Sequence, residues 1–126
     1  MLLLDTCALI WLVSGDSALS KKAKETIQNT PEVYVSSISA FEIGHKYQSG
    51  GLELPLEASL WYRRSLEQHN LLELPLDGEL CLLSTRLPSH HRDPCDRFII
   101  AAALRNRWAV VTADRKFEKY GVEVVS

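Results

Sequence analysis

Four acidic residues lie beside apolar residues that predict a strand end or a helix, where a charged side chain is unusual: Asp5, Glu42, Asp96 and Asp114. Two like charges about 4 Å apart repel by roughly 4 kcal/mol at an effective dielectric of about 20. A cluster of such carboxylates is therefore either protonated or holds a cation. Oxygen ligands without a Cys or His set suit Mg²⁺ or Mn²⁺, and such ions assist phosphodiester hydrolysis.

Two of these acids have a simpler alternative as helix caps. Asp5 directly follows Leu2–Leu4 and could cap a helix that begins at Thr6, since Asp is a favoured N-cap residue. Asp114 follows an apolar run and could serve as a turn or cap residue before Arg115–Tyr120. The residues alone leave both roles open at both positions.

Glu42 belongs to a set with the spacing i, i+3, i+4, i+7, which predicts one apolar helix face: Ile38, Phe41, Glu42 and His45. A carboxylate on such a face is desolvated and needs a partner. The alternative is a capping box over Ser39–Glu42, in which the acid reaches back to the helix start. Three serines compete for the cap position: Ser36, Ser37 and Ser39.

The segment Asp93-Pro94-Cys95-Asp96 has the pattern of a helix start. Asp93 is placed as the N-cap and Pro94 at the first helical position, and both acids favour the positive end of the helix. Capping explains Asp93 well. It explains Asp96 less fully, because the cap is already supplied one turn earlier.

The elements that position these residues alternate along the chain. Short β-type runs are expected at 2–4, 33–35, 71–74, 109–111 and 122–125, and helices at 8–13, 20–29, 39–48, 56–69, 79–87 and 95–106. This order favours an α/β fold with a mainly parallel central sheet and helices on both faces. In open sheets of this kind ligands bind beyond the carboxyl ends of the strands, which is where the four acids are expected.

Length and composition predict one globular domain over residues 1–126. With 46% hydrophobic and 24% charged residues, the chain has the composition of neither a disordered nor a membrane protein. Its longest apolar run, Phe98–Leu104, is too short to span a bilayer, and the N-terminal residues lack the basic region of a signal peptide. A net charge of −2 argues against nucleic-acid binding by bulk positive charge alone. The three cysteines, Cys7, Cys81 and Cys95, indicate reduced buried thiols and a cytoplasmic location.

Several other kinds of site are disfavoured. No cysteine pair has zinc-site spacing, there is no glycine-rich phosphate loop, and the pair Glu42 and His45 lacks the second copy that a di-iron site needs. Cys7 and Ser14 lack the partners of a nucleophile. His90 and His91 fall in a polar loop, where solvated residues or weak phosphate contacts are expected.

Four motifs together resemble the PIN-domain ribonucleases, most closely the VapC-type toxins of toxin–antitoxin pairs. The motifs are Leu4-Asp5-Thr6, Ser39-Ala40-Phe41-Glu42-Ile43, His91-Arg92-Asp93-Pro94-Cys95-Asp96-Arg97 and Thr112-Ala113-Asp114. The resemblance covers essentially the whole chain, and the third motif is the most specific. It departs from the usual pattern at Cys95, where an aromatic or aliphatic residue is more common.

The resemblance implies roles for individual residues. The family's acidic quartet, which is both catalytic and metal-binding, falls on Asp5, Glu42, Asp96 and Asp114. Of these, the first three would hold the principal metal ion, and Asp114 would position water or complete a second metal site. Three further positions match supporting residues: Thr112 for the metal shell, Asp93 mainly as a cap, and Arg97 for pairing with the carboxylates or contacting RNA.

The resemblance also implies a three-layer α/β/α domain and an endoribonuclease that requires Mg²⁺ or Mn²⁺. A homodimer, a cognate antitoxin that covers the active-site groove, and a tRNA or rRNA target are implied as well. Basic residues near the active edge are expected to offset the carboxylates and receive RNA: Arg92, Arg97, Arg115 and Lys116.

Two alternatives remain open from the sequence. One is a PIN nuclease for RNA processing that has no antitoxin, for which the neighbouring gene is the discriminating observation. The other is a binding module whose acids only cap helices. A metal titration separates the binding module from both nucleases, because a quartet that binds an ion gains thermal stability by mass action.

Overall fold

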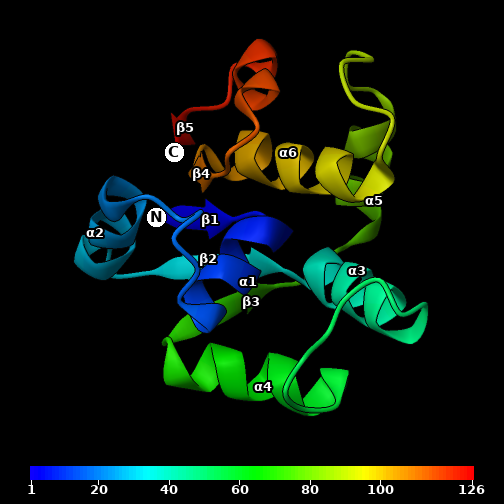
Figure 1. The fold of residues 1–126 in the computed structure, drawn as a ribbon. Coiled ribbons are helices and arrows are strands. Elements are labelled where there is room, and N and C mark those ends of the chain that lie inside the picture. The colour runs from blue at the N-terminus through cyan, green and yellow to red at the C-terminus, as the bar shows by residue number, and fades with distance from the viewer.

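The computed structural model describes residues 1–126 as a five-stranded sheet between helices (Figure 1). The strands are β1 (Leu2–Leu4), β2 (Val33–Ser36), β3 (Leu71–Leu74), β4 (Ala109–Val111) and β5 (Val124–Val125). Their order in the sheet is β3-β2-β1-β4-β5, and every neighbouring pair is parallel. The predicted α/β class is confirmed, with a sheet that is parallel throughout and a last strand two residues shorter than expected.

All six predicted helices are present: α1 (Thr6–Ser14), α2 (Lys21–Asn29), α3 (Ser37–Gln48), α4 (Ala58–Gln68), α5 (Gly78–Thr85) and α6 (Pro94–Asn106). A short 3-10 helix, η1, covers Arg115–Tyr120. The predicted loop at 50–55 lies between α3 and α4. No helix boundary differs from its prediction by more than two residues: α1 and α3 begin two residues earlier than the apolar pattern indicates, α4 begins two residues later, and α5 ends two residues earlier.

The sheet separates two apolar clusters, which gives the three-layer architecture. In β1, Leu2 and Leu4 face a cluster built with α1, α2 and α4, whereas Leu3 faces a second cluster built with α5, α6 and η1. Alternate strand residues point to opposite faces, so both faces of this central strand are buried. Figure 1 shows α6 and η1 on one side of the sheet and α1 and α4 on the other.

The strand order indicates where a ligand would bind, at the carboxyl ends of β1 and its neighbours. From β1 the chain adds β2 and β3 on one side and β4 and β5 on the other. Leu4 is in register with both Val35 and Val111, so Asp5 and Thr112 follow their strands at the same level. Crevices at such a reversal of strand order commonly bind ligands.

The structure shows which of the predicted helix caps are present. The carboxylates of Asp5, Asp93 and Asp114 cap α1, α6 and η1, as the simpler interpretation of each predicts. The N-cap of α3 is Ser36, not Ser39. Glu42 therefore lies beyond the first turn, and the capping box is wrong.

The cysteines are all free, as expected, but only Cys95 is buried. Cys7 is exposed on the first turn of α1 and Cys81 is partly exposed, so the expectation of three buried thiols is wrong for these two. Burial raises the pKa of the Cys95 thiol to about 11. No helix has the length and apolar character needed to cross a membrane.

Candidate active site

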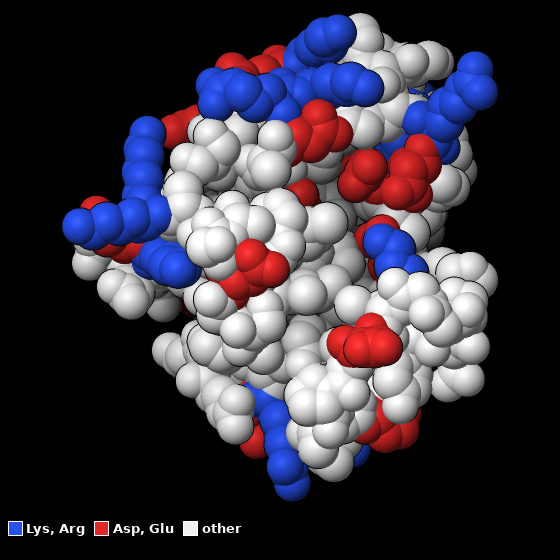
Figure 2. All heavy atoms as spheres, in the orientation of Figure 1, with Lys and Arg blue, Asp and Glu red and all other residues white.

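Four structural elements bring the four predicted acids to the carboxyl end of the sheet. Asp5 follows β1, Asp114 follows β4, and α3 and α6 supply Glu42 and Asp96. Burial is the first cause that raises the pKa values of Asp5 and Asp96, and neighbouring charges add to it: Glu42 and Asp114 at Asp5, and Asp93, Glu42 and Asp5 at Asp96. Figure 2 shows acidic side chains on this face of the molecule, with basic side chains gathered along its upper part.

Asp5 is the most buried of the four, with 8% of its surface exposed. Its Oδ1 accepts a hydrogen bond of 2.8 Å from the backbone N–H of Ala8. Burial raises the pKa of this carboxyl, although hydrogen bonds with the Thr112 side chain and the Ala8 N–H oppose the shift. One side chain thus serves as both helix cap and site carboxylate.

Glu42 lies in a different setting from the one that its spacing predicted. The residues that α3 buries are Ile38, Ser39 and Ile43, whereas Phe41 is 61% exposed and stacks on the exposed ring of His45. The predicted apolar face is therefore wrong beyond Ile38. Because the sheet contacts the Ile38–Ser39–Ile43 side, the Phe41–His45 side turns outward.

The Glu42 side chain is nevertheless largely covered, with 15% exposure, and is paired with Lys46 at 3.1 Å. Lys46 was not among the predicted site residues, although its i+4 spacing from a glutamate was visible in the sequence. A buried hydrogen bond joins α3 to α1, with Thr6 Oγ1 and Ser39 Oγ 2.9 Å apart. This contact fixes the start of α1 beside the first turn of α3, and so places Asp5 near Glu42.

Asp96 lies in the first turn of α6 and is partly buried. Burial, together with the negative charges of Asp93, Glu42 and Asp5, raises its pKa to about 6, while His91 opposes the shift. Asp93 caps α6 through a 2.9 Å bond from the N–H of Cys95, in agreement with the structural role expected for it. The same helix start thus carries one carboxylate that caps and one that faces the site.

Asp114 is held at both oxygens. Its Oδ1 accepts from the N–H of Lys116 at 3.0 Å and its Oδ2 lies 2.7 Å from Nε2 of His91, while its own N–H donates to Thr112 Oγ1 at 3.0 Å. Burial alone would raise the pKa of Asp114, but the hydrogen bonds from His91 and Lys116 outweigh it and lower the pKa. Asp114 is therefore the carboxylate best stabilised in its charged form.

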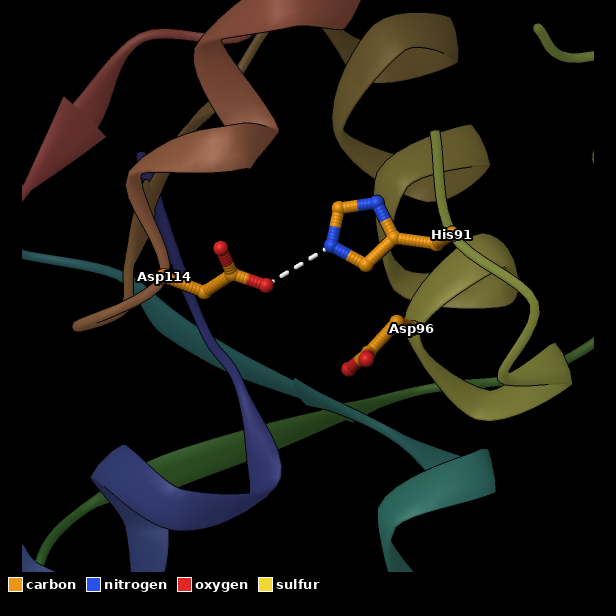
Figure 3. A group of neighbouring side chains, drawn as sticks. All are labelled: His91, Asp96 and Asp114. Atoms are coloured by element: carbon orange, nitrogen blue, oxygen red, sulfur yellow. Dashed lines mark hydrogen bonds and ion pairs between the residues drawn. The ribbon is translucent and has the colours of Figure 1, made fainter. Parts of the chain in front are cut away.

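His91 is the residue at this site whose surroundings differ most from the sequence-based prediction. Its side chain is 7% exposed, not solvated, and its ring meets Phe117 edge-on at 5.3 Å. Its Nδ1 lies 3.0 Å from the Tyr120 hydroxyl. His91, Asp96 and Asp114 each offer an atom within 4.8 Å of the others and point into one space (Figure 3). The sequence feature that could have predicted the burial of His91 is the pair of aromatic residues that follows Asp114 in η1, Phe117 and Tyr120.

Arg97 does not contact the carboxylates. Its guanidinium makes five hydrogen bonds of 2.8–3.2 Å, all to backbone carbonyl oxygens in the last turn of α5 and in the α5–α6 connection: Ser84, Leu87, Pro88 and His91. These contacts are different from the carboxylate pairing expected for it. Of the other predicted RNA-binding residues, Arg92, Arg115 and Lys116 are exposed, and Arg115 also pairs with Glu118 at 2.9 Å.

The model of the PIN domain family matches residues 2–123. The chain belongs to the PIN-domain family. Among curated relatives, this PIN domain is 27% identical over 119 residues to Ribonuclease VapC22 of Mycobacterium tuberculosis, covering 94% of this chain and 90% of the relative.

Solved structures show the same fold. VapBC from Salmonella typhimurium, bound to DNA, superposes with a TM-score of 0.72 at 21% identity, covering 98% of this chain and 96% of that one. A toxin–antitoxin complex from Klebsiella pneumoniae gives a TM-score of 0.68 at 20% identity, with 100% and 97% coverage. The predicted three-layer PIN fold is confirmed by these likenesses.

The donor set of this PIN domain fits a hard divalent cation. Asp5 and Asp96 are carboxylates whose burial makes the negative charge costly. At Glu42 the negative charge is paired with one cation, the ammonium group of Lys46. A divalent cation coordinated by oxygen ligands would offset that cost. The acids that would hold it are those predicted from the sequence, Asp5, Glu42, Asp96 and Asp114.

Proposed function

We propose that this PIN domain, spanning residues 1–126 as one unit, is a metal-dependent endoribonuclease that acts as the toxin of a toxin–antitoxin pair. The observation that carries the proposal is the convergence of four carboxylates at the carboxyl ends of parallel strands in a chain of the PIN family. The curated relative, Ribonuclease VapC22, supports ribonuclease activity. The structural neighbours are toxin–antitoxin complexes, which supports a cognate antitoxin as partner.

The cofactor in this proposal is Mg²⁺ or Mn²⁺. Asp5, Glu42 and Asp96 would hold the principal ion, and Asp114 would position water or complete a second site. When bound, an ion of this kind activates water and neutralises charge on the phosphate that is cleaved. Thr112 would support the metal shell by holding Asp5 and the backbone of Asp114.

The protein's own residues then prepare the site. Lys46 pairs with Glu42 at 3.1 Å, so a bound ion would exchange one positive partner of Glu42 for another. Arg92, Arg115 and Lys116 are exposed near the site and would receive RNA phosphates. Because five carbonyl contacts engage the Arg97 guanidinium, its part in this proposal is to support the loop.

The substrate and the assembly are further parts of the proposal. A tRNA or rRNA is the expected target, and a homodimer is the expected state of the toxin. A short upstream reading frame with a DNA-binding N-terminus would support the antitoxin. A nuclease of RNA processing would lack such a neighbour.

The direct test is RNA cleavage with and without ligand variants. We expect Asp5→Ala and Asp96→Asn to abolish cleavage nearly completely while the protein stays folded. Asp77→Asn is a matched control, because Asp77 also caps a helix but pairs with Arg105 near the opposite end of α6. Wild-type cleavage by Asp96→Asn would refute the assignment.

The cellular target can be identified with the same pair of proteins. Sequencing RNA ends after brief induction of the wild type, beside Asp96→Asn, should give sites that only the wild type produces. Identical ends in both strains would argue against cleavage by this site.

A further inference from the structure

His91 stands between the acidic site and the aromatic side chains of η1. It lies in the α5–α6 connection, five residues before Asp96, and its side chain is almost fully buried. Figure 3 shows the ring of His91 facing Asp114, with the Asp96 carboxylate below both. Nothing in the acidic quartet requires a histidine here, so the ring needs its own explanation.

The contacts define which ring nitrogen carries hydrogen. A carboxylate has only acceptor atoms, so the 2.7 Å contact between Nε2 and Asp114 Oδ2 requires a hydrogen on Nε2. In the neutral ring Nδ1 then accepts, and the Tyr120 hydroxyl at 3.0 Å is the donor that it meets. With the ring neutral, Tyr120, His91 and Asp114 form a chain of hydrogen bonds with one direction, from the Tyr120 hydroxyl through His91 to Asp114.

The ring is also held by contacts that do not involve Asp114. Phe117 meets it edge-on at 5.3 Å, and Arg97 donates to the His91 carbonyl oxygen at 3.2 Å. The other Arg97 contacts fix the loop residues before it. A ring fixed in this way can determine the position of a carboxylate that hydrogen-bonds to it.

We propose that His91 is a positioning residue for Asp114: it donates Nε2–H to Oδ2 and so sets the orientation in which Asp114 faces the other acids. The inference rests on the proposed function, since Asp114 matters here as part of a metal site. Groups that hold and orient ligand carboxylates typically change metal affinity by about 10–100-fold when removed. Tyr120 supports His91 by occupying Nδ1.

Direct binding of a metal ion by Nε2 is the competing use of this ring. The three groups are close enough for it, since His91, Asp96 and Asp114 offer atoms within 4.8 Å of one another. Nε2 would then have to lose its hydrogen and with it the bond to Asp114. The two uses therefore predict different behaviour when Asp114 is changed.

The test measures Mn²⁺ affinity by titration calorimetry in a double-mutant cycle. We expect His91→Phe to weaken binding by about tenfold, and by no more than Asp114→Asn does. The double variant should bind as Asp114→Asn does, because His91 acts through Asp114. Losses that add in the double variant, or no loss in His91→Phe, would overturn the proposal.

Three further variants separate positioning from folding. His91→Gln can present an amide N–H toward Asp114 and should recover affinity to within a few-fold of the wild type. Tyr120→Phe, which removes only the hydroxyl, should weaken binding less than His91→Phe. His90→Phe is the matched control, because His90 is exposed and also contacts Tyr120 edge-on but has no bond to the carboxylate. Equal effects of His90→Phe and His91→Phe would contradict the proposal.

A metal-free measurement distinguishes failure of this inference from failure of the proposed function. Ring ¹⁵N shifts should report hydrogen on Nε2 of His91, and Asp114→Asn should speed exchange of that hydrogen. Hydrogen on Nδ1 instead would overturn the inference whatever the metal result. If the wild type binds no Mn²⁺ while these shifts are as expected, the metal-dependent function fails, and the positioning of Asp114 stands.

Discussion

At the scale of single residues, Asp96 combines its proposed role as a metal ligand with a cost in stability. An unfolded aspartate loses its proton near pH 4, whereas burial and neighbouring acids raise the folded pKa of Asp96 to about 6. Between these values the folded state binds more protons, so the free energy of unfolding falls as pH rises. Above pH 6 the whole penalty is present.

Asp96→Asn should therefore stabilise the metal-free protein at pH 7.5, by about 1–2 kcal/mol given the partial exposure of the side chain. Urea unfolding in EDTA measures this gain, which should vanish well below pH 4, where the carboxyl is neutral in both the folded and the unfolded state. The control is Asp77→Asn, which should lose stability at pH 7.5, because Arg105 lowers the pKa of Asp77. A less stable Asp96→Asn at pH 7.5 would contradict the account.

The positions of the acids could be predicted from the sequence, but the burial and exposure of the residues around them could not. Asp5 and Asp114 were predictable because each lies within three residues of the end of an apolar strand, and parallel strands end at a common edge. His91 was not, because its burial depends on Phe117 and Tyr120, which are more than 25 residues away in the chain. The exposure of Phe41 was equally hidden, since periodicity shows a face but not which side of the helix the sheet covers.

At the scale of elements, the α5–α6 connection is shaped by one side chain. The Arg97 guanidinium donates to carbonyl oxygens of Ser84, Leu87, Pro88 and His91. The planar guanidinium presents five N–H donors in a fixed fork, whereas an ammonium has three donors on a flexible stem. The position of His91, and through it Asp114, therefore depends on a residue that touches no acid.

Arg97→Lys should loosen this connection although it keeps the charge. We expect a loss of about 1–3 kcal/mol in unfolding free energy, as several charge-assisted hydrogen bonds are removed. Hydrogen exchange should rise in residues 86–93 more than elsewhere. Arg92→Lys is the control, because Arg92 lies in the same connection and is exposed. Unchanged exchange in Arg97→Lys would show that other contacts hold the loop.

The elements themselves were largely predictable, for local reasons. Strands β1, β3 and β4 have their predicted bounds, and α2 begins one residue after its predicted start because Ser20 is its N-cap. Helices α1 and α3 begin early because Asp5 and Ser36 cap them directly at the strand ends. Apolar periodicity cannot show such a start, since the first turn of α1 includes the buried but polar Thr6 and the exposed Cys7.

At the scale of the whole molecule, the net charge of −2 hides an uneven distribution. Acids from four elements meet at one end of the sheet, and basic side chains lie beside them on the same face (Figure 2). A cation that binds the folded state alone stabilises the whole domain by mass action. At tenfold the dissociation constant the gain is about 1.4 kcal/mol, or a rise of roughly 3–6 °C in Tm for a chain of this size.

Thermal unfolding in millimolar Mn²⁺ or Mg²⁺ should show this rise for the wild type and for Asp77→Asn. Asp96→Asn should start from a higher Tm without metal and gain little with it. Asp96→Asn should thus have the higher Tm without metal and the smaller rise in Tm with it. This combination is expected only if the Asp96 carboxylate destabilises the folded protein until a cation binds. A wild-type Tm indifferent to both ions would favour a binding module instead of a nuclease.

RNA binding by this nearly neutral molecule should depend on a few local cations. Each phosphate contact with single-stranded RNA contributes about 0.7 to the slope of log K against log salt. In an Asp96→Asn background that prevents cleavage, Arg115→Ala with Lys116→Ala should lower that slope by about 1–1.5. The matched pair Arg63→Ala with Arg64→Ala removes the same charge from α4, on the other side of the sheet (Figure 1). Because attraction at the site is local, the α4 pair should leave the slope nearly unchanged. Equal losses from both pairs would mean that RNA responds to total charge and not to the rim of the acidic site.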